Sequence, residues 1–127
     1  MKVCKTVDEL VLQIKEDFDG ECWGRPTDII GFGEKGRLLA ERLEALVGVK
    51  EICFYDKRIK EDEKYHYLDF EKMIEKSEIM IVMDEGYLDL IKGEEGFDRS
   101  TRLYFLDEGV VFSGGGGGEC GDRIYGK

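Results

Sequence analysis

Positive charge is scarce in this sequence of 127 residues, in which 19 lysines and arginines face 29 aspartates and glutamates, a net charge of −10. A surface this acidic repels both the phosphate backbone of nucleic acids and anionic lipid headgroups. We therefore expect no nucleic-acid partner and no membrane partner. Apolar residues make up 42% of the chain and charged residues 38%, a balance typical of a globular domain large enough to bury a core.

Cysteine motifs and long apolar runs are also lacking. The four cysteines are Cys4, Cys22, Cys53 and Cys120, and no two of them form a C-x-x-C pair. The spacing of a zinc knuckle is absent, so we expect no metal site. No segment has the pattern of a signal peptide or a membrane span, so the protein is predicted to be cytoplasmic, with its thiols reduced.

The stretch 29–36 runs from two isoleucines into three glycines spaced G-x-G-x-x-G, and a helical pattern begins directly behind them. In this spacing Gly31 allows a tight turn, Gly33 lets a pyrophosphate approach the main chain, and Gly36 lets the helix pack close to the strand. The helix N-terminus offers N–H donors and a partial positive charge to phosphates. The pattern is typical of a dinucleotide site. Its candidate residues are Gly31, Phe32, Gly33, Glu34, Lys35 and Gly36.

An acid follows the second apolar run, since Asp56 lies twenty positions after Gly36. A carboxylate at this place accepts hydrogen bonds from a ribose diol and repels a 2′-phosphate, so it favours NAD over NADP. Lys57 and Arg58 come next and could bind that phosphate, which keeps NADP as an alternative, or they could be solvated loop charges. Asp84, after the third apolar run, could face the ligand or cap the next helix.

Four apolar segments alternate with helical patterns along the chain. Strands are expected at 28–32, 51–56, 79–83 and 102–106. Alternation of this kind indicates a parallel sheet with right-handed crossovers. The expected fold class is therefore α/β, a three-layer Rossmann-type parallel sheet of about four strands in the order 3-2-1-4, with an N-terminal helix.

The helices are predicted from caps and apolar spacing. Thr6 and Glu9 have the pattern of a capping box, and the helix behind them is expected to end near Phe18. A longer helix is expected over 34–47, before Gly48, a natural stop. Its buried stripe is predicted to contain Leu38, Leu39, Leu43 and Leu46. Residues 1–5 are expected to form a short lead, 65–68 an extended piece, and 69–76 and 85–92 short helices.

The segments 23–37 and 55–58 resemble the cofactor domain of D-isomer-specific 2-hydroxyacid dehydrogenases. In that family a Trp-containing connector leads into Ile-Ile-Gly-x-Gly-x-x-Gly, and the next strand often ends in Tyr-Asp-Arg-Arg; here it ends in Tyr-Asp-Lys-Arg. The likeness covers roughly residues 7–84 and implies an NAD-binding domain. The family's catalytic Arg, in an Asn-x-Ala-Arg-Gly context, has no counterpart in Leu-Asp-Glu-Gly-Val at 106–110. Its catalytic His and its substrate domain are also missing, so the resemblance implies a cofactor domain without the catalytic part.

Three functions fit these features: a binding or regulatory module that holds NAD without turnover, a small NAD-dependent oxidoreductase completed by dimerisation, and a fold that binds nothing. A further alternative is an adenosylmethionine-binding protein. Such proteins usually carry an acid two residues before the first glycine, whereas this chain has Ile29. An edge strand and the small size favour a homodimer. The one histidine, His66, is interpreted as a surface or packing residue, and no catalytic residue is assigned.

The composition changes at the end of the chain. Residues 1–112 are predicted to form the nucleotide-binding domain and 113–127 a Gly-rich C-terminal tail, which contains five consecutive glycines, Gly114–Gly118. Such a run is interpreted as a flexible connector. Two alternatives are a loop that closes over a bound anion and an arm that contacts a second copy. Trp23, the one tryptophan, is expected to pack the N-terminal helix against the sheet.

Overall fold

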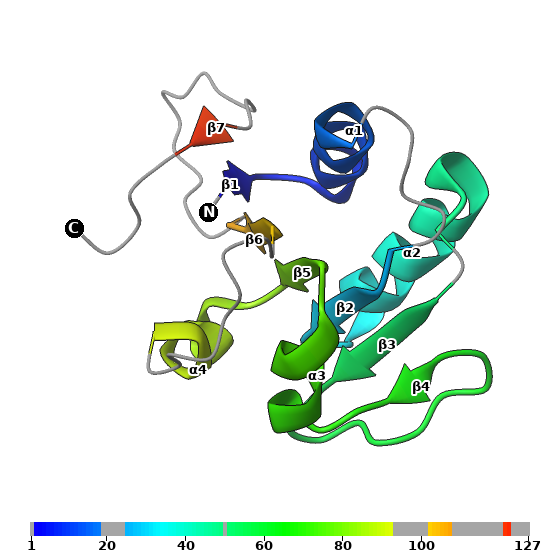
Figure 1. Cartoon of the computed structure of the whole chain (residues 1–127), viewed down its shortest axis with the longest axis vertical. Coiled ribbons are helices and arrows are strands. Elements are labelled where there is room, and N and C mark those ends of the chain that lie inside the picture. The colour runs from blue at the N-terminus through cyan, green and yellow to red at the C-terminus, as the bar shows by residue number, and fades with distance from the viewer. Residues whose placement is uncertain (1, 19–24, 50, 93–101, 108–120, 123–127) are drawn as a thin grey trace.

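The computed structural model describes residues 2–18, 25–49, 51–92, 102–107 and 121–122, and Figure 1 shows their arrangement. In this part of the chain seven strands form one sheet, in the order β4-β3-β2-β5-β6-β1-β7. The strands are β1 (Lys2–Cys4), β2 (Thr27–Ile30), β3 (Ile52–Tyr55), β4 (His66–Tyr67), β5 (Ile79–Val82), β6 (Arg102–Leu106) and β7 (Gly121–Asp122). Neighbouring strands are parallel except β1 and β7, which are antiparallel.

Helices cover both faces of the sheet. They are α1 (Val7–Asp17), α2 (Glu34–Arg42), the π-helical η1 (Leu43–Val47), α3 (Phe70–Lys76), the 3-10 turn η2 (Glu85–Tyr87) and α4 (Leu88–Lys92). Side chains of α1, α2 and η1 share one apolar cluster with the sheet, and those of α3, η2 and α4 share the other. In Figure 1, α3 lies in front of the sheet and α2 behind it. The expected three-layer Rossmann-type α/β class is therefore confirmed.

The predicted strand order 3-2-1-4 is wrong. The four predicted strands correspond to β2, β3, β5 and β6, and they lie in the order β3-β2-β5-β6. The place beside β3 is taken by β4, which pairs through Cys53↔His66 and Phe54↔Tyr67. The chain thus moves outward from β2 to β4 and then returns across β2 to β5. This reversal makes the carboxyl ends of β2 and β5 the switch point of the sheet, where ligands bind in open α/β folds.

Two segments expected to lie outside the sheet belong to it. Lys2–Cys4, expected to be a lead, form β1 beside β6, and Gly121–Asp122, in the expected tail, form β7 beside β1. Trp23, the run 114–118 and the remaining tail lie outside the described residues.

The expectation of reduced thiols is wrong for Cys4, which is disulfide-bonded, whereas Cys53 is free. Disulfides are typical of oxidising compartments and of some hyperthermophile proteins, so the cytoplasmic location stays a prediction.

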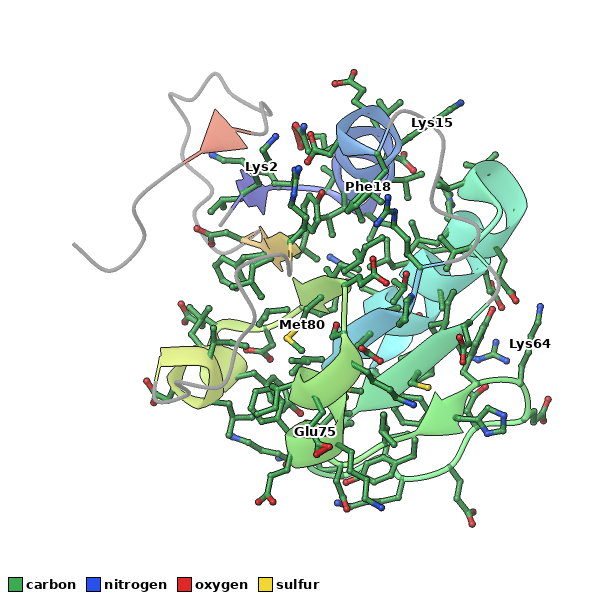
Figure 2. All side chains as sticks on the ribbon, viewed as in Figure 1. Lys2, Lys15, Phe18, Lys64, Glu75 and Met80 are labelled. Carbon is green, nitrogen blue, oxygen red and sulfur yellow. The ribbon has the colours of Figure 1, made fainter. Side chains whose placement is uncertain are left out.

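The N-terminal cap of α1 confirms the predicted capping box. The Thr6 hydroxyl accepts a hydrogen bond from the Glu9 N–H at 3.1 Å. The Glu9 carboxylate reaches back to the N–H of Lys5, at 3.3 Å, one residue earlier than in the usual motif. α1 ends at Asp17, and Phe18, labelled in Figure 2, packs against the cluster under α1 and α2.

The helix after the glycine turn departs from the predicted stripe. Leu39 and Leu43 are fully buried as expected, but Leu38 and Leu46 are 38% and 60% exposed. The last turn of the helix, η1, is π-helical. A π-helical turn holds about one residue more than an α-helical turn, so the residue that faces the sheet is Val47 in place of Leu46. The helix ends at Gly48, whose φ of 78° is left-handed and suits glycine.

Candidate functional site

The glycine turn sits at the carboxyl end of β2, between β3 and β5. The Gly31 N–H donates to the Tyr55 carbonyl at 2.8 Å, and the Met83 N–H donates to the Ile30 carbonyl at 2.8 Å. These bonds fix the turn to both neighbouring strands. Gly31 has a φ of 95°, a left-handed conformation that a side chain would strain.

Gly36 is closely packed against the turn, whereas Gly33 has open space around it. A Cβ on Gly36 would lie 2.4 Å from the Gly31 carbonyl oxygen, so a side chain there would push helix α2 away from the turn. A Cβ on Gly33 would have no neighbouring heavy atom within 4 Å. Gly33 is the N-cap of α2 and makes no side-chain cap bond, while N–H groups in the first turn of a helix have no acceptor within the helix. Bare main chain at Gly33 is therefore open to a ligand.

Asp56 lies at the end of β3 and points at the glycine turn. One carboxylate oxygen, Oδ2, accepts from the Phe32 N–H at 2.7 Å. The other, Oδ1, accepts from the N–H groups of Arg58 at 2.8 Å and Ile59 at 2.9 Å. Burial acts to raise the pKa of Asp56, but the hydrogen bonds from Ile59, Arg58 and Phe32 outweigh it and hold the pKa below the usual 3.8. Asp56 is therefore an ionised, anchored carboxylate at neutral pH.

A cavity of about 480 Å³ lies over this turn. It is lined by Gly31, Gly33, Lys35, Gly36, Asp56, Lys57, Arg58, Ile59, Met83, Asp84, Gly86 and Tyr87. The cavity thus brings together the predicted site residues except Phe32 and Glu34. Phe32 is buried and stacks on Phe54 with 4.1 Å between ring centroids. Glu34 lines a separate hollow on the outer side of α2.

Four lining residues were not predicted from the sequence: Ile59, Met83, Gly86 and Tyr87. All but Ile59 follow β5, and β5 was expected on the far side of β3. With β5 beside β2, its carboxyl end faces the glycine turn, so a correct strand order would have identified them. The Asp84 carboxylate caps η2 by accepting from the Gly86 N–H at 2.9 Å, which agrees with the capping alternative for this residue.

A second hollow, of about 920 Å³, lies beyond β4 at the edge of the sheet. It is larger and more open than the glycine cavity, and the Arg37 cation in its lining is already paired. Arg37 donates to Asp62, which also lines the hollow, and to Glu41 on its own helix, each at 2.9 Å. The exposed His66 also lines this hollow, away from the glycine turn. We therefore place the candidate site at the glycine cavity, where main-chain donors and an anchored acid converge.

One buried acid lies away from this cavity and was not singled out from the sequence. Asp28, in β2, is 3% exposed and faces the end of α3. Burial raises its pKa to about 6, against the opposing effects of Ser77 and Lys76. Its Oδ2 has no hydrogen-bond partner.

In the described ranges, no three histidine, cysteine or acidic side chains gather as metal ligands would. No helix there is long and apolar enough to cross a bilayer.

Comparisons with known proteins give matches to solved structures. No protein-family model and no curated protein matches the sequence. The NAD-dependent formate dehydrogenase of Staphylococcus aureus, crystallised in complex with NAD, is 20% identical over 62% of this chain, with a TM-score of 0.48. The TT0316 protein of Thermus thermophilus is 18% identical over 60% of this chain, with a TM-score of 0.44. The matched region spans 30% and 28% of those two proteins.

Proposed function

We propose that this domain binds a nucleotide that carries a pyrophosphate and a ribose, with NAD favoured and NADP as the alternative. The observation that carries the proposal is the open main chain at Gly33, the N-cap of α2, in a cavity that the anchored Asp56 also lines. A pyrophosphate needs close approach to bare main chain and to the donors of a helix N-terminus. The cavity volume of about 480 Å³ lies within the range of small-molecule sites.

The charge at Asp56 supports NAD over NADP. Its lowered pKa keeps the carboxylate ionised at neutral pH, and an anion there repels a 2′-phosphate. Lys57 is the neighbouring cation, but its ammonium group lies over the Tyr87 ring, 5.0 Å from the centroid. That contact holds the charge against an aromatic face. The same cavity could hold the adenosine of adenosylmethionine, which lacks a pyrophosphate, so that ligand belongs in the test.

We infer binding without turnover, as in a regulatory module. Both acids that line the cavity already bind main-chain N–H groups: Asp56 holds the glycine turn and Asp84 caps η2. Neither carboxylate is therefore assigned the role of a catalytic acid or base. An oxidoreductase would need its acid–base groups from elsewhere, for example from a second copy of the chain. The homodimer stays a prediction, which sedimentation velocity would test. Incubation of NADH with a panel of 2-oxo acids would reveal turnover as a loss of absorbance.

Titration calorimetry with a substitution at Gly33 tests the binding proposal. The ligands are NAD+, NADH, NADP+, NADPH, ATP and adenosylmethionine. Gly33→Val should abolish binding of the pyrophosphate ligands, because the side chain fills the space the phosphates need. Leu38→Val, on the same helix but outside the cavity, is the matched control and should bind as the unmodified protein does. Equal affinities for all three proteins would contradict the proposal, and so would a Kd weaker than about 1 mM, roughly −4 kcal/mol, for every ligand.

A further inference from the structure

The loop that joins β3 to β4, residues 56–65, separates the two hollows (Figure 1). Its residues 57–59 line the glycine cavity, and its residues 60–63 line the hollow beyond β4. The loop is therefore a wall of both hollows, and the contacts that hold it in place also set the width of the glycine cavity.

Two aspartates hold the main chain of this loop. Near β3, Asp56 binds the loop through the two N–H groups described above. Near β4, the Asp62 Oδ2 accepts from the N–H groups of Lys64 at 2.9 Å and Tyr65 at 3.1 Å. Burial acts to raise the pKa of Asp62, but hydrogen bonds from Lys64, Arg37 and Tyr65 hold it below the usual 3.8. Asp62 is therefore a second ionised, anchored carboxylate.

The other oxygen of Asp62 joins the loop to helix α2. The Arg37 Nε donates to the Asp62 Oδ1 at 2.9 Å. Arg37 directly follows Gly36, and its main-chain N–H donates to the Gly33 carbonyl at 3.0 Å. The side chains are 39% exposed at Arg37 and 12% exposed at Asp62, so water screens the pair and its contribution to stability is small. What the contact fixes is the position of the loop relative to the start of α2.

The part of the loop that lines the glycine cavity lies between two anchors that both lead back to the glycine turn and its helix. At one anchor Asp56 accepts from the Phe32 N–H at 2.7 Å, and at the other Asp62 accepts from Arg37. A further tie, from the Tyr65 hydroxyl to η1 at 2.6 Å, lies beyond Asp62 and so outside this part of the loop. Loss of the contact with Arg37 would leave the lining residues held at one end.

We propose that Asp62 is a positioning residue of the candidate site, which acts through Arg37 to keep residues 57–59 at the distance from α2 that a bound nucleotide requires. ADP would contact the N-terminus of α2 with its phosphates and the loop with its ribose. Linked groups reinforce each other only when the two parts of the site keep the matching spacing, and a loop held before binding costs less to order. Inorganic pyrophosphate would contact the helix N-terminus alone. This inference rests on the proposed nucleotide-binding function and adds to it a residue outside the cavity.

NMR titration with ADP and with inorganic pyrophosphate, followed at the amides of the glycine turn, tests this role from both sides of the contact. Asp62→Asn keeps an oxygen for the loop N–H groups but loses the charge that pairs with Arg37. Arg37→Met keeps the length of the side chain but loses its donors. Each variant should bind ADP about tenfold more weakly and bind pyrophosphate as the unmodified protein does. The double variant should lose no more than either single variant, because both remove the same contact.

Glu41→Gln is the matched control. Arg37 donates to Glu41 at 2.9 Å, the same distance as to Asp62, but Glu41 lies on the same helix, so this contact does not reach the loop. This variant should bind both ligands unchanged. Hydrogen exchange in the protein without ligand gives a second readout. The amides of Arg58 and Ile59 should exchange faster in Asp62→Asn and Arg37→Met than in the unmodified protein, and at the unmodified rate in Glu41→Gln.

The outcomes separate this inference from the proposed function. If ADP binds with the same affinity in every variant, or if pyrophosphate weakens as much as ADP, the positioning role is refuted while nucleotide binding stands. Unchanged exchange at both loop amides would also refute it. If ADP binds the unmodified protein no more tightly than about 1 mM, nucleotide binding and the positioning role fall together.

Discussion

Replacement of Asp28 by asparagine tests how the buried acid beneath α3 couples stability to pH. The carboxyl is 3% exposed, and its Oδ2 has no hydrogen-bond partner. Burial raises the pKa from 3.8 to about 6. The difference corresponds to about 3 kcal/mol of unfolding free energy, at about 1.4 kcal/mol for each pH unit.

The sign follows from which state holds the proton. Between pH 3.8 and about 6 the folded protein keeps Asp28 protonated while the unfolded chain releases the proton. The stabilisation is complete below pH 3.8 and is lost as the pH rises to about 6. Other acids also titrate in this range, so the informative quantity is the difference between the unmodified protein and Asp28→Asn. Asparagine has the same shape but no charge, which removes the contribution.

Urea unfolding at intervals from pH 4 to pH 8 measures this difference. Relative to the unmodified protein, Asp28→Asn should gain about 2.5 kcal/mol between pH 4 and pH 8, because a small part of the stabilisation is already lost at pH 4. Most of the gain should appear before pH 6. A fixed offset from burying the amide shifts every point equally and leaves the trend intact. A difference that is constant across the series, or that grows as the pH falls, would refute the assignment of a raised pKa to this residue.

Two further substitutions test the packing of the turn and the opposite sign of pH dependence. Gly36→Ala should lower the unfolding free energy by about 1–3 kcal/mol, because its Cβ would lie 2.4 Å from the Gly31 carbonyl oxygen. Gly33→Ala should cost less, so equal losses in urea unfolding would contradict the packing described for α2. For Asp17, burial raises the pKa, but the hydrogen bond from Lys2 leads a set of contacts that hold it below 3.8. The stabilisation that ionised Asp17 provides should therefore be lost as the pH falls below about 4. The measurement is the pH midpoint of acid unfolding in Asp17→Asn. A midpoint equal to that of the unmodified protein would show that the contact with Lys2 contributes nothing.

Local signals in the sequence predicted the parts of the fold that depend on near neighbours. The capping box at Thr6 and the stop at Gly48 involve contacts within a few residues, and both are present. The four apolar runs became strands; β2 and β5 are buried along their whole length, as interior parallel strands are. The glycine spacing marked the turn, since its geometry is set within six residues.

Features that depend on distant contacts could not be predicted in this way. β4 has two residues and β1 has three, which is too short for a period of two to appear. The extended piece expected at 65–68 contains β4, but its pairing with β3 was not predicted, and the strand order came out wrong. The π-turn at the end of α2 moved Leu46 to the surface without any local mark in the sequence. Tyr87 acts on Lys57, thirty positions away, and this contact exists only because β5 lies beside β2.

Amide chemical-shift mapping with NAD+ tests the central claim most directly, because each residue of the cavity reports separately. The account predicts saturable shifts at Gly31, Gly33 and Gly36 and over Lys57–Ile59, with the amides around His66 unchanged. Signals at the glycine turn that do not move at NAD+ concentrations above about 1 mM, or shifts that gather at the hollow beyond β4, would contradict it.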